Sequence, residues 1–298
     1  MKLQFDNIQN PQADPFIFED EGRLYLYVTG KTGITAFSSD SLFGLWKDEG
    51  IVCQMEGKED FWAPSVIRLE DGYYMYTSFN TIGEEFSEFM VVAKADNPLG
   101  PFTVQKQLYP RFSIDSHAVK NENGLFLFYA ENSTEGQRIG TRIYVDRMLT
   151  PDTPANLCRE LVVPTMDEEI FKYKPEEPRQ WHTLEGPFYF KEGDYHYLMY
   201  SGGCYQNDTY HIGYAVAHSE ESDLTKLTFE KVTGKDGIFD PVLFQNEVEE
   251  GVGHHSVIKW QGEYYAIYHG RDREDGAVRT ARVCRLLVKD GRITAERM

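Results

Sequence analysis

The 298-residue sequence lacks several features that would assign it to a common class of protein. Its four cysteines include no Cys-x-x-Cys pair, so neither a zinc site nor a disulfide framework is indicated. No run of about 18 apolar residues could cross a bilayer, so we expect no membrane partner. The first seven residues, MKLQFDN, have none of the apolar character of a secretion signal. We therefore expect a cytoplasmic protein.

Positive charge is also scarce. The chain has 30 Lys and Arg against 48 Asp and Glu, a formal net charge of −18. Phosphate binding needs concentrated basic side chains, so nucleic acid is excluded as an expected partner. What the sequence does have is 19 Tyr and 19 Phe within a 41% hydrophobic composition, enough to bury a large core. We expect one domain over residues 1–298.

The aromatic residues recur in one unit, which reads as strand, glycine turn, strand. Its first copy spans residues 12–29, with apolar residues on both sides of an acidic turn. The turn glycines of the five copies are Gly22, Gly72, Gly124, Gly193 and Gly262, separated by 50, 52, 69 and 69 residues. Repeats of this length are typical of propeller blades with long loops. The sequence therefore predicts an all-β fold, a five-bladed β-propeller.

Each repeat also carries a polar or aromatic residue about eight to ten positions before its glycine. These residues are Asp14, Trp62, Asp115, Glu185 and His254. The first strand of each propeller blade lines the central axis, so the five side chains should converge there. One Asp before a hairpin is usually a turn residue, but five such residues at one repeat position favour a functional site.

Converging carboxylates suit glycoside hydrolysis. One protonated acid donates to the leaving oxygen, the other carboxylate activates water, and a third acid raises the pKa of the donor. Sugars stack on aromatic rings and bind through hydroxyl groups. The candidate substrate-binding residues are Phe16, Trp62, Phe112, Trp181, Tyr205, His254 and Arg271. Trp181 is a candidate pocket wall because it ends a long loop, and Arg279 competes with Arg271.

Five motifs in this order give the chain a resemblance to glycoside hydrolase family 43. They are Ala13-Asp14-Pro15, Trp62-Ala63-Pro64, Ile114-Asp115, Glu185-Gly186-Pro187 and Gly253-His254-His255-Ser256. The family contains five-bladed propellers that act as β-xylosidases, α-L-arabinofuranosidases and arabinanases. The resemblance implies an inverting hydrolase with Asp14 as general base and Glu185 as general acid. Asp115 would then tune and orient Glu185.

The resemblance also bears on cofactors and metal ions. No cofactor is required, although the family equivalent of His254 often approaches a cation through water, so Ca²⁺ in the central channel is an expected possibility. No Asp-rich calcium loop is present, and imidazole is a poor direct ligand for that ion.

The expected partner is a small oligosaccharide, and the preferred activity is release of α-L-arabinofuranosyl residues from plant-derived oligosaccharides. The alternatives are a β-xylosidase, another exo- or endo-acting glycosidase of the same fold, and a propeller that binds carbohydrate or protein without catalysis. Three converging carboxylates speak against a pure binder, because their repulsion costs stability. Oligomeric state remains open.

Overall fold

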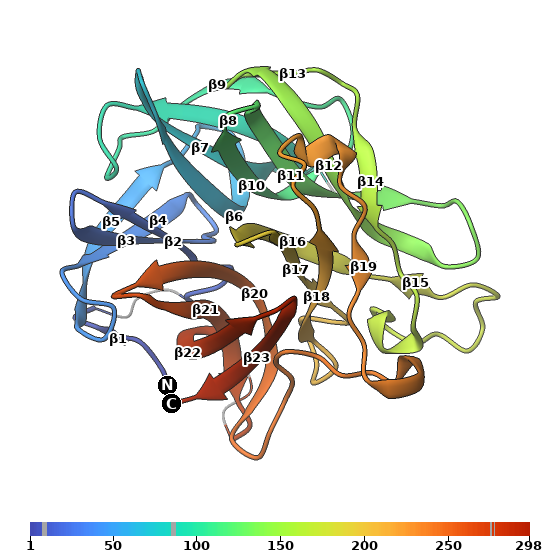
Figure 1. Ribbon diagram of the computed structural model, residues 1–298. Helices are drawn as coiled ribbons and strands as arrows, with labels where there is room; N and C mark the ends of the chain where they lie inside the picture. Colours follow the sequence, from blue (N-terminus) through green and yellow to red (C-terminus); the bar gives the residue numbers. More distant parts are fainter. Residues whose placement is uncertain (8–10, 85–87, 275, 277) are drawn as a thin grey trace.

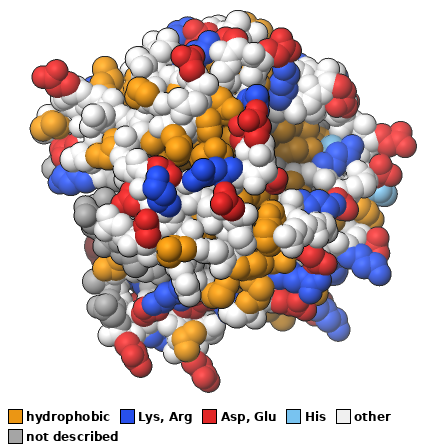
Figure 2. Space-filling model, turned by 90° about the vertical axis from the view of Figure 1, so that its left-hand side faces the viewer, with side chains coloured by type: hydrophobic (Ala, Val, Ile, Leu, Met, Phe, Trp, Pro, Cys, Tyr) orange, Lys and Arg blue, Asp and Glu red, His pale blue; other side chains and the backbone are white. Residues whose placement is uncertain are grey.

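The computed structural model describes residues 1–7, 11–84, 88–274, 276 and 278–298. Five sheets stand around a central axis (Figure 1), which confirms the prediction of an all-β five-bladed β-propeller. Within these residues no helix has both the length and the apolar character needed to span a membrane. On the face drawn in Figure 2, acidic and basic side chains are interspersed.

Each blade is built from consecutive antiparallel strands. Blade 1 contains β2 (Phe16–Asp20), β3 (Arg23–Val28), β4 (Ile34–Ser39) and β5 (Leu45–Cys53). Blade 2 contains β6 (Lys58–Leu69), β7 (Gly72–Thr81), β8 (Phe89–Ala95) and β9 (Thr103–Gln107). Blade 3 begins with β10 (Ile114–Asn121), β11 (Gly124–Ser133) and β12 (Ile139–Thr150). Blade 4 contains β16 (Leu184–Glu192), β17 (Tyr195–Gly202), β18 (His211–His218) and β19 (Glu230–Lys231). Blade 5 contains β20 (Glu249–Trp260), β21 (Glu263–Asp272), β22 (Thr280–Lys289) and β23 (Arg292–Arg297).

The acidic glycine turns connect the first two strands of the blades. In blade 1, Asp20 pairs with Arg23 across Glu21 and Gly22, whose φ values are 51° and 81°. Positive φ at both central residues is the type I′ geometry, which matches the right-handed twist of the flanking strands.

Hydrophobic clusters join each blade to the next. One cluster brings Tyr27 of blade 1 against Met75 of blade 2, and four further clusters join the remaining neighbouring pairs around the ring. Tyr27 and Met75 are completely buried. Each fully buried side chain of this size contributes about 1.5–3 kcal/mol, so the interfaces between blades hold the axis rigid.

The N-terminal segment spans the seam between blades 5 and 1. The backbone N–H of Leu3 donates to the carbonyl of Ala281 at 3.0 Å, and β1 (Gln4–Phe5) then pairs in parallel with β5. Two blades that are distant in sequence are therefore joined through the backbone.

The long stretch between blades 3 and 4 forms the outer edge of blade 3. It contains β13 (Thr153–Pro154), β14 (Arg159–Val162), the 3₁₀ turn η1 (Asp167–Glu169) and β15 (Trp181–His182), and all three strands pair with β12. Two more 3₁₀ turns, η2 (Leu224–Lys226) and η3 (Lys235–Gly237), follow β18. Gly140 of β12 is required at the contact with β15, because a Cβ there would lie 1.9 Å from the carbonyl oxygen of His182.

Candidate active site

Next to the central axis, the innermost strand of every blade contains, or closely follows, a residue in the left-handed conformation. These residues are Asp14, Ala63, Asp115, Gly186 and His254, with φ between 41° and 59°. The ladder register shifts at this point in blades 2 to 5. The conformation costs a non-glycine residue about 1–2 kcal/mol, and such strain is concentrated at functional sites.

The predicted equivalence of the five axial residues is wrong by one position in two blades. In blade 2 the left-handed residue is Ala63 rather than Trp62, and in blade 4 it is Gly186 rather than Glu185. Counting back from the turn glycine cannot find this offset, because a bulge changes the count without changing the hydrophobic pattern.

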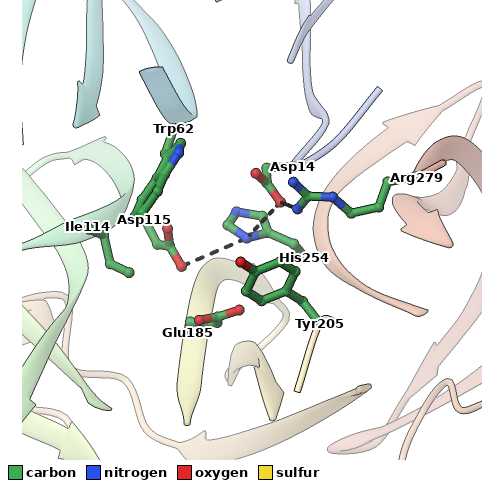
Figure 3. Close-up of a pocket in the computed structure, with 8 residues that line it drawn as sticks. All are labelled: Asp14, Trp62, Ile114, Asp115, Glu185, Tyr205, His254 and Arg279. Atoms are coloured by element: carbon green, nitrogen blue, oxygen red, sulfur yellow. Dashed lines mark hydrogen bonds and ion pairs between the residues drawn. The ribbon is translucent and has the colours of Figure 1, made fainter. Parts of the chain in front are cut away.

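Side chains from all five blades nevertheless converge on one pocket (Figure 3). Its lining residues are Asp14, Trp62, Ile114, Asp115, Glu185, Tyr205, His254 and Arg279. Six of them were predicted as site residues from the sequence. The other two are Ile114, which precedes Asp115 in its motif, and Arg279, the alternative to Arg271.

Four predicted substrate-binding residues lie outside this lining. Phe16 borders a smaller cavity next to the pocket, with its ring 6.2 Å from that of Phe188. Phe112 packs against the core between blades 3 and 4. Trp181 belongs to the edge strand β15. Arg271 pairs with Glu250 at 3.2 Å.

Arg279, rather than the predicted Arg271, lies at the pocket. Its Nη1 atom lies 3.3 Å from Oδ1 of Asp14, and its guanidinium stands 5.1 Å from the ring centre of Tyr205. Arg271 instead donates to the carbonyl of Gln206 at 3.0 Å, beside Tyr205 in the chain. Arg279 is thus the arginine that contacts both Asp14 and the pocket residue Tyr205.

Asp14 is held as a carboxylate. Thr29 donates its hydroxyl to Oδ2 at 2.6 Å, and Nδ1 of His269 lies 3.2 Å from Oδ1. Burial acts to raise the pKa of Asp14, but His254, Arg279 and His269 outweigh burial and hold that pKa well below its usual range. Since burial lowers the pKa of both histidines, Arg279 is the partner charged at neutral pH.

Glu185 and Asp115 behave in the opposite way. Burial raises the pKa of Glu185 to about 7, the charge of Asp14 adds to the increase, and a hydrogen bond from Tyr210 opposes it. Burial, Glu185 and Asp14 together raise the pKa of Asp115 well above its usual range. The backbone N–H of Gly186 donates to Oδ2 of Asp115 at 2.9 Å. One ionised carboxylate and one protonated carboxyl group in a shared pocket are the assignment expected for a base and an acid.

Three supporting residues, Thr29, Tyr210 and His269, are not among the site residues predicted from the sequence. Each contacts a catalytic candidate. Thr29 also accepts a hydrogen bond from the backbone N–H of Ala63 at 2.9 Å, so it connects Asp14 to the strained residue of blade 2. The contacts of Thr29 with Ala63 and of His269 with Asp14 depend on how blades meet, which the repeat pattern does not describe.

The side chains near His254 supply few direct ligands for a calcium ion. Asp115, Glu185 and His254 place one donor atom each within 4.8 Å of one another. Two of these groups are carboxyls and the third is an imidazole, whereas calcium prefers six to eight oxygen ligands, so a calcium ion held mainly through water stays a prediction. The smaller cavity beside His255 leaves about 10 Å³ for a water-sized sphere, roughly the minimum for one water molecule.

Comparison with known proteins places the chain in a defined group. Residues 7–291 match the family Glycosyl hydrolases family 43. A probable arabinan endo-1,5-alpha-L-arabinosidase A from Aspergillus niger is 27% identical over 203 residues, covering 64% of this chain and 58% of the relative. The extracellular exo-alpha-(1->5)-L-arabinofuranosidase ArbA from Cellvibrio japonicus is 23% identical and covers 92% of this chain and 82% of its own.

Solved structures share the architecture. A thermostable family-43 glycoside hydrolase has a TM-score of 0.80 at 27% identity, covering 95% of this chain and 92% of its own. An alpha-L-arabinofuranosidase from Lactobacillus brevis has a TM-score of 0.77 at 20% identity, covering 95% and 93%. The second similarity is one of fold alone.

Proposed function

The chain belongs to glycosyl hydrolases family 43, and from that premise we propose that it hydrolyses α-L-arabinofuranosyl linkages with inversion, releasing arabinose from the ends of plant-derived oligosaccharides. The observation that carries the proposal is the placement of two carboxyl groups in one pocket, with their pKa values shifted in opposite directions. Asp14 has a lowered pKa, and Glu185 has a pKa raised to about 7.

The two groups divide the reaction between them. Ionised Asp14 accepts a proton from a water molecule as that water attacks the anomeric carbon, and protonated Glu185 donates its proton to the departing glycosidic oxygen. Both carboxyl groups end the step with their protonation exchanged, and solvent resets them. Asp115 is proposed to orient Glu185, since a carboxyl oxygen of each lies within 4.8 Å of the other in a buried setting. The scheme requires no cofactor.

The pocket also offers surfaces for a sugar ring. Trp62, Ile114 and Tyr205 supply apolar walls, while Arg279 supplies hydrogen-bond donors. Arabinose is proposed as the sugar because both curated relatives described above carry arabinan or arabinofuranoside linkages in their names. Action at chain ends is proposed because the exo-acting relative is matched over most of its length, and the endo-acting one over little more than half.

The first test is hydrolysis of nitrophenyl α-L-arabinofuranoside and nitrophenyl β-D-xyloside by the wild type, Asp14→Asn and Glu185→Gln. We expect turnover of the arabinoside, with a rate about 10²–10⁴-fold lower in the variants. Proton NMR of the first product should show the inverted anomer. Retained configuration, or full activity of Asp14→Asn, would overturn the mechanism, and turnover of the xyloside alone would change the sugar.

A second assay separates action at chain ends from internal cleavage. Linear arabino-oligosaccharides labelled at the reducing end are sampled early in the reaction. Exo action releases free arabinose from the first time point and shortens the labelled chains by one unit at a time. A burst of intermediate oligosaccharides would instead assign endo action.

A further inference from the structure

Tyr210 is a buried side chain that contacts the general acid without lining the pocket. It lies just before β18, is fully buried, and donates its hydroxyl to Oε1 of Glu185 at 2.5 Å. We propose that Tyr210 is a positioning residue, which fixes Oε1 of Glu185 so that the transferable proton is carried by Oε2. The inference rests on the proposed function, because it assigns Glu185 the role of acid.

The ring of Tyr210 packs closely against blade 5. It lies against Gly253 in β20, where a Cβ atom would come within 2.0 Å of Cε1 of the ring. It also stacks on His269 of β21, the cross-strand partner of Gly253, with ring centres 5.6 Å apart and planes inclined by 15°. A ring packed against these two residues holds its hydroxyl in place, which is the condition for positioning another group.

The stacked pair connects the two catalytic candidates. Tyr210 contacts Glu185, and Nδ1 of His269 accepts a hydrogen bond from the backbone N–H of Asp14 at 3.2 Å. Since the two rings stack on each other, both catalytic candidates contact one stacked pair of rings between blades 4 and 5. This stacked pair therefore helps to set the separation between the carboxyl oxygens of Asp14 and Glu185, which lie on opposite sides of the bound sugar in the proposed mechanism.

The hydroxyl of Tyr210 serves only as a donor here. Burial first, and then the charge of Glu185, raise the pKa of Tyr210 well above 10, so the phenol does not ionise during catalysis. Other titratable or charged groups that face Glu185 are Asp14, Asp115, Cys204, Tyr205, His254 and Arg279. Among these contacts the hydrogen bond from Tyr210 is the largest influence that lowers the pKa of Glu185.

Removal of the hydroxyl therefore has two consequences. In Tyr210→Phe the acid loses its fixed orientation, so substrates whose leaving group needs a proton should suffer most. We expect kcat to fall about 10-fold or more with arabinobiose, and much less with a dinitrophenyl arabinoside, which departs without protonation. The alkaline limb of kcat/KM should also move up by about one pH unit, because the carboxylate loses a charge-assisted hydrogen bond.

A matched control is Tyr214→Phe, in the same blade. Its hydroxyl is also buried, but it accepts from the backbone N–H of Ile293 at 3.1 Å and does not touch the acid. This variant should lose stability without changing the ratio of rates on the two substrates or the alkaline limb. A Tyr210→Phe enzyme that keeps the wild-type ratio and the wild-type limb would overturn the proposal.

Direct titration of Glu185 by NMR tests the role of Tyr210 without relying on catalytic activity. Carboxyl signals of ¹³C-labelled glutamate are followed by NMR in the wild type and in Tyr210→Phe, and Glu185→Gln identifies the signal of the acid. The pKa of Glu185 should rise in Tyr210→Phe and stay unchanged in Tyr214→Phe. An inactive wild type with this shift present would refute the proposed function alone, whereas an absent shift would refute the role of Tyr210.

Discussion

Replacement of Arg279 by methionine is the most direct probe of how the base is kept ionised. The substitution removes the cation that lies 3.3 Å from Oδ1 of Asp14 and keeps much of the side-chain length. Arg279 lowers the pKa of Asp14, so its removal should raise that pKa. The acidic limb of kcat/KM, below which the base is protonated, should therefore move to higher pH.

The size of the shift follows from the distance. Two unit charges 3.3 Å apart attract by about 5 kcal/mol at an effective dielectric constant of about 20, which is a ceiling. The side chain of Arg279 is 26% exposed, so water screens part of this attraction. Aspartates beside an arginine usually shift by about 1–3 pKa units, and we expect the lower end, about one unit. The alkaline limb should move in the same direction by less, because Arg279 has the smallest influence on Glu185.

The assay is kcat/KM on the aryl arabinoside, with each sample returned to neutral pH to confirm that the enzyme survived. Arg279→Lys keeps the charge but loses the flat contact with Tyr205, so it should raise KM and leave the acidic limb in place. Arg271→Met is the matched control, because its ion pair is with Glu250. An unmoved acidic limb in Arg279→Met would refute the reasoning.

Two further predictions concern stability. The pKa of Glu185 rises from 4.5 to about 7 on folding, so its ionisation destabilises the folded state as pH rises through that interval, by at most about 3 kcal/mol. Glu185→Gln should therefore melt a few degrees higher than the wild type at pH 8 and at the same temperature at pH 4; equal melting temperatures at both would contradict the raised pKa. Gly253→Ala places a Cβ 2.0 Å from Tyr210 and should lower the free energy of unfolding in urea by about 1–3 kcal/mol. Gly22→Ala, which meets no atom within 4 Å, should cost about 1 kcal/mol for its positive φ alone, and a smaller effect at Gly253 would argue against the close packing of the tyrosine.

The sequence was sufficient to predict the ring of five blades and the meeting of five side chains on its axis. Both follow from local signals, namely glycine turns and alternating aromatic residues, that repeat with the blade. Asp14 and Asp115 could be found because the left-handed position itself carries the acid. Glu185 and Trp62 each stand one residue before the left-handed residue of their blade. They were still found, because the prediction accepted any position eight to ten residues before the turn glycine.

What the sequence could not predict lies between blades. The choice of Arg279 over Arg271 depends on the path of the chain after β21, and the role of Tyr210 depends on a glycine in the neighbouring blade. Phe16, Phe112 and Trp181 are aromatic residues close in sequence to site motifs, yet packing directs them elsewhere. Hydrophobicity makes an aromatic side chain equally suited to a core and to a sugar platform.

The pairing of β15 with β12 has a consequence for how the chain acquires its shape. Ile139 and Gly140 must wait for Trp181 and His182, some forty residues later, before the edge of blade 3 is covered. During synthesis from the N-terminus, β13 and β14 can cover most of that edge, but its end at Ile139 and Gly140 stays open until the chain has reached a point only a few residues short of Glu185. The last strand pair of the third blade thus forms only when the acid is about to be added, and a nascent chain stopped earlier would expose this unpaired end of β12 to aggregation.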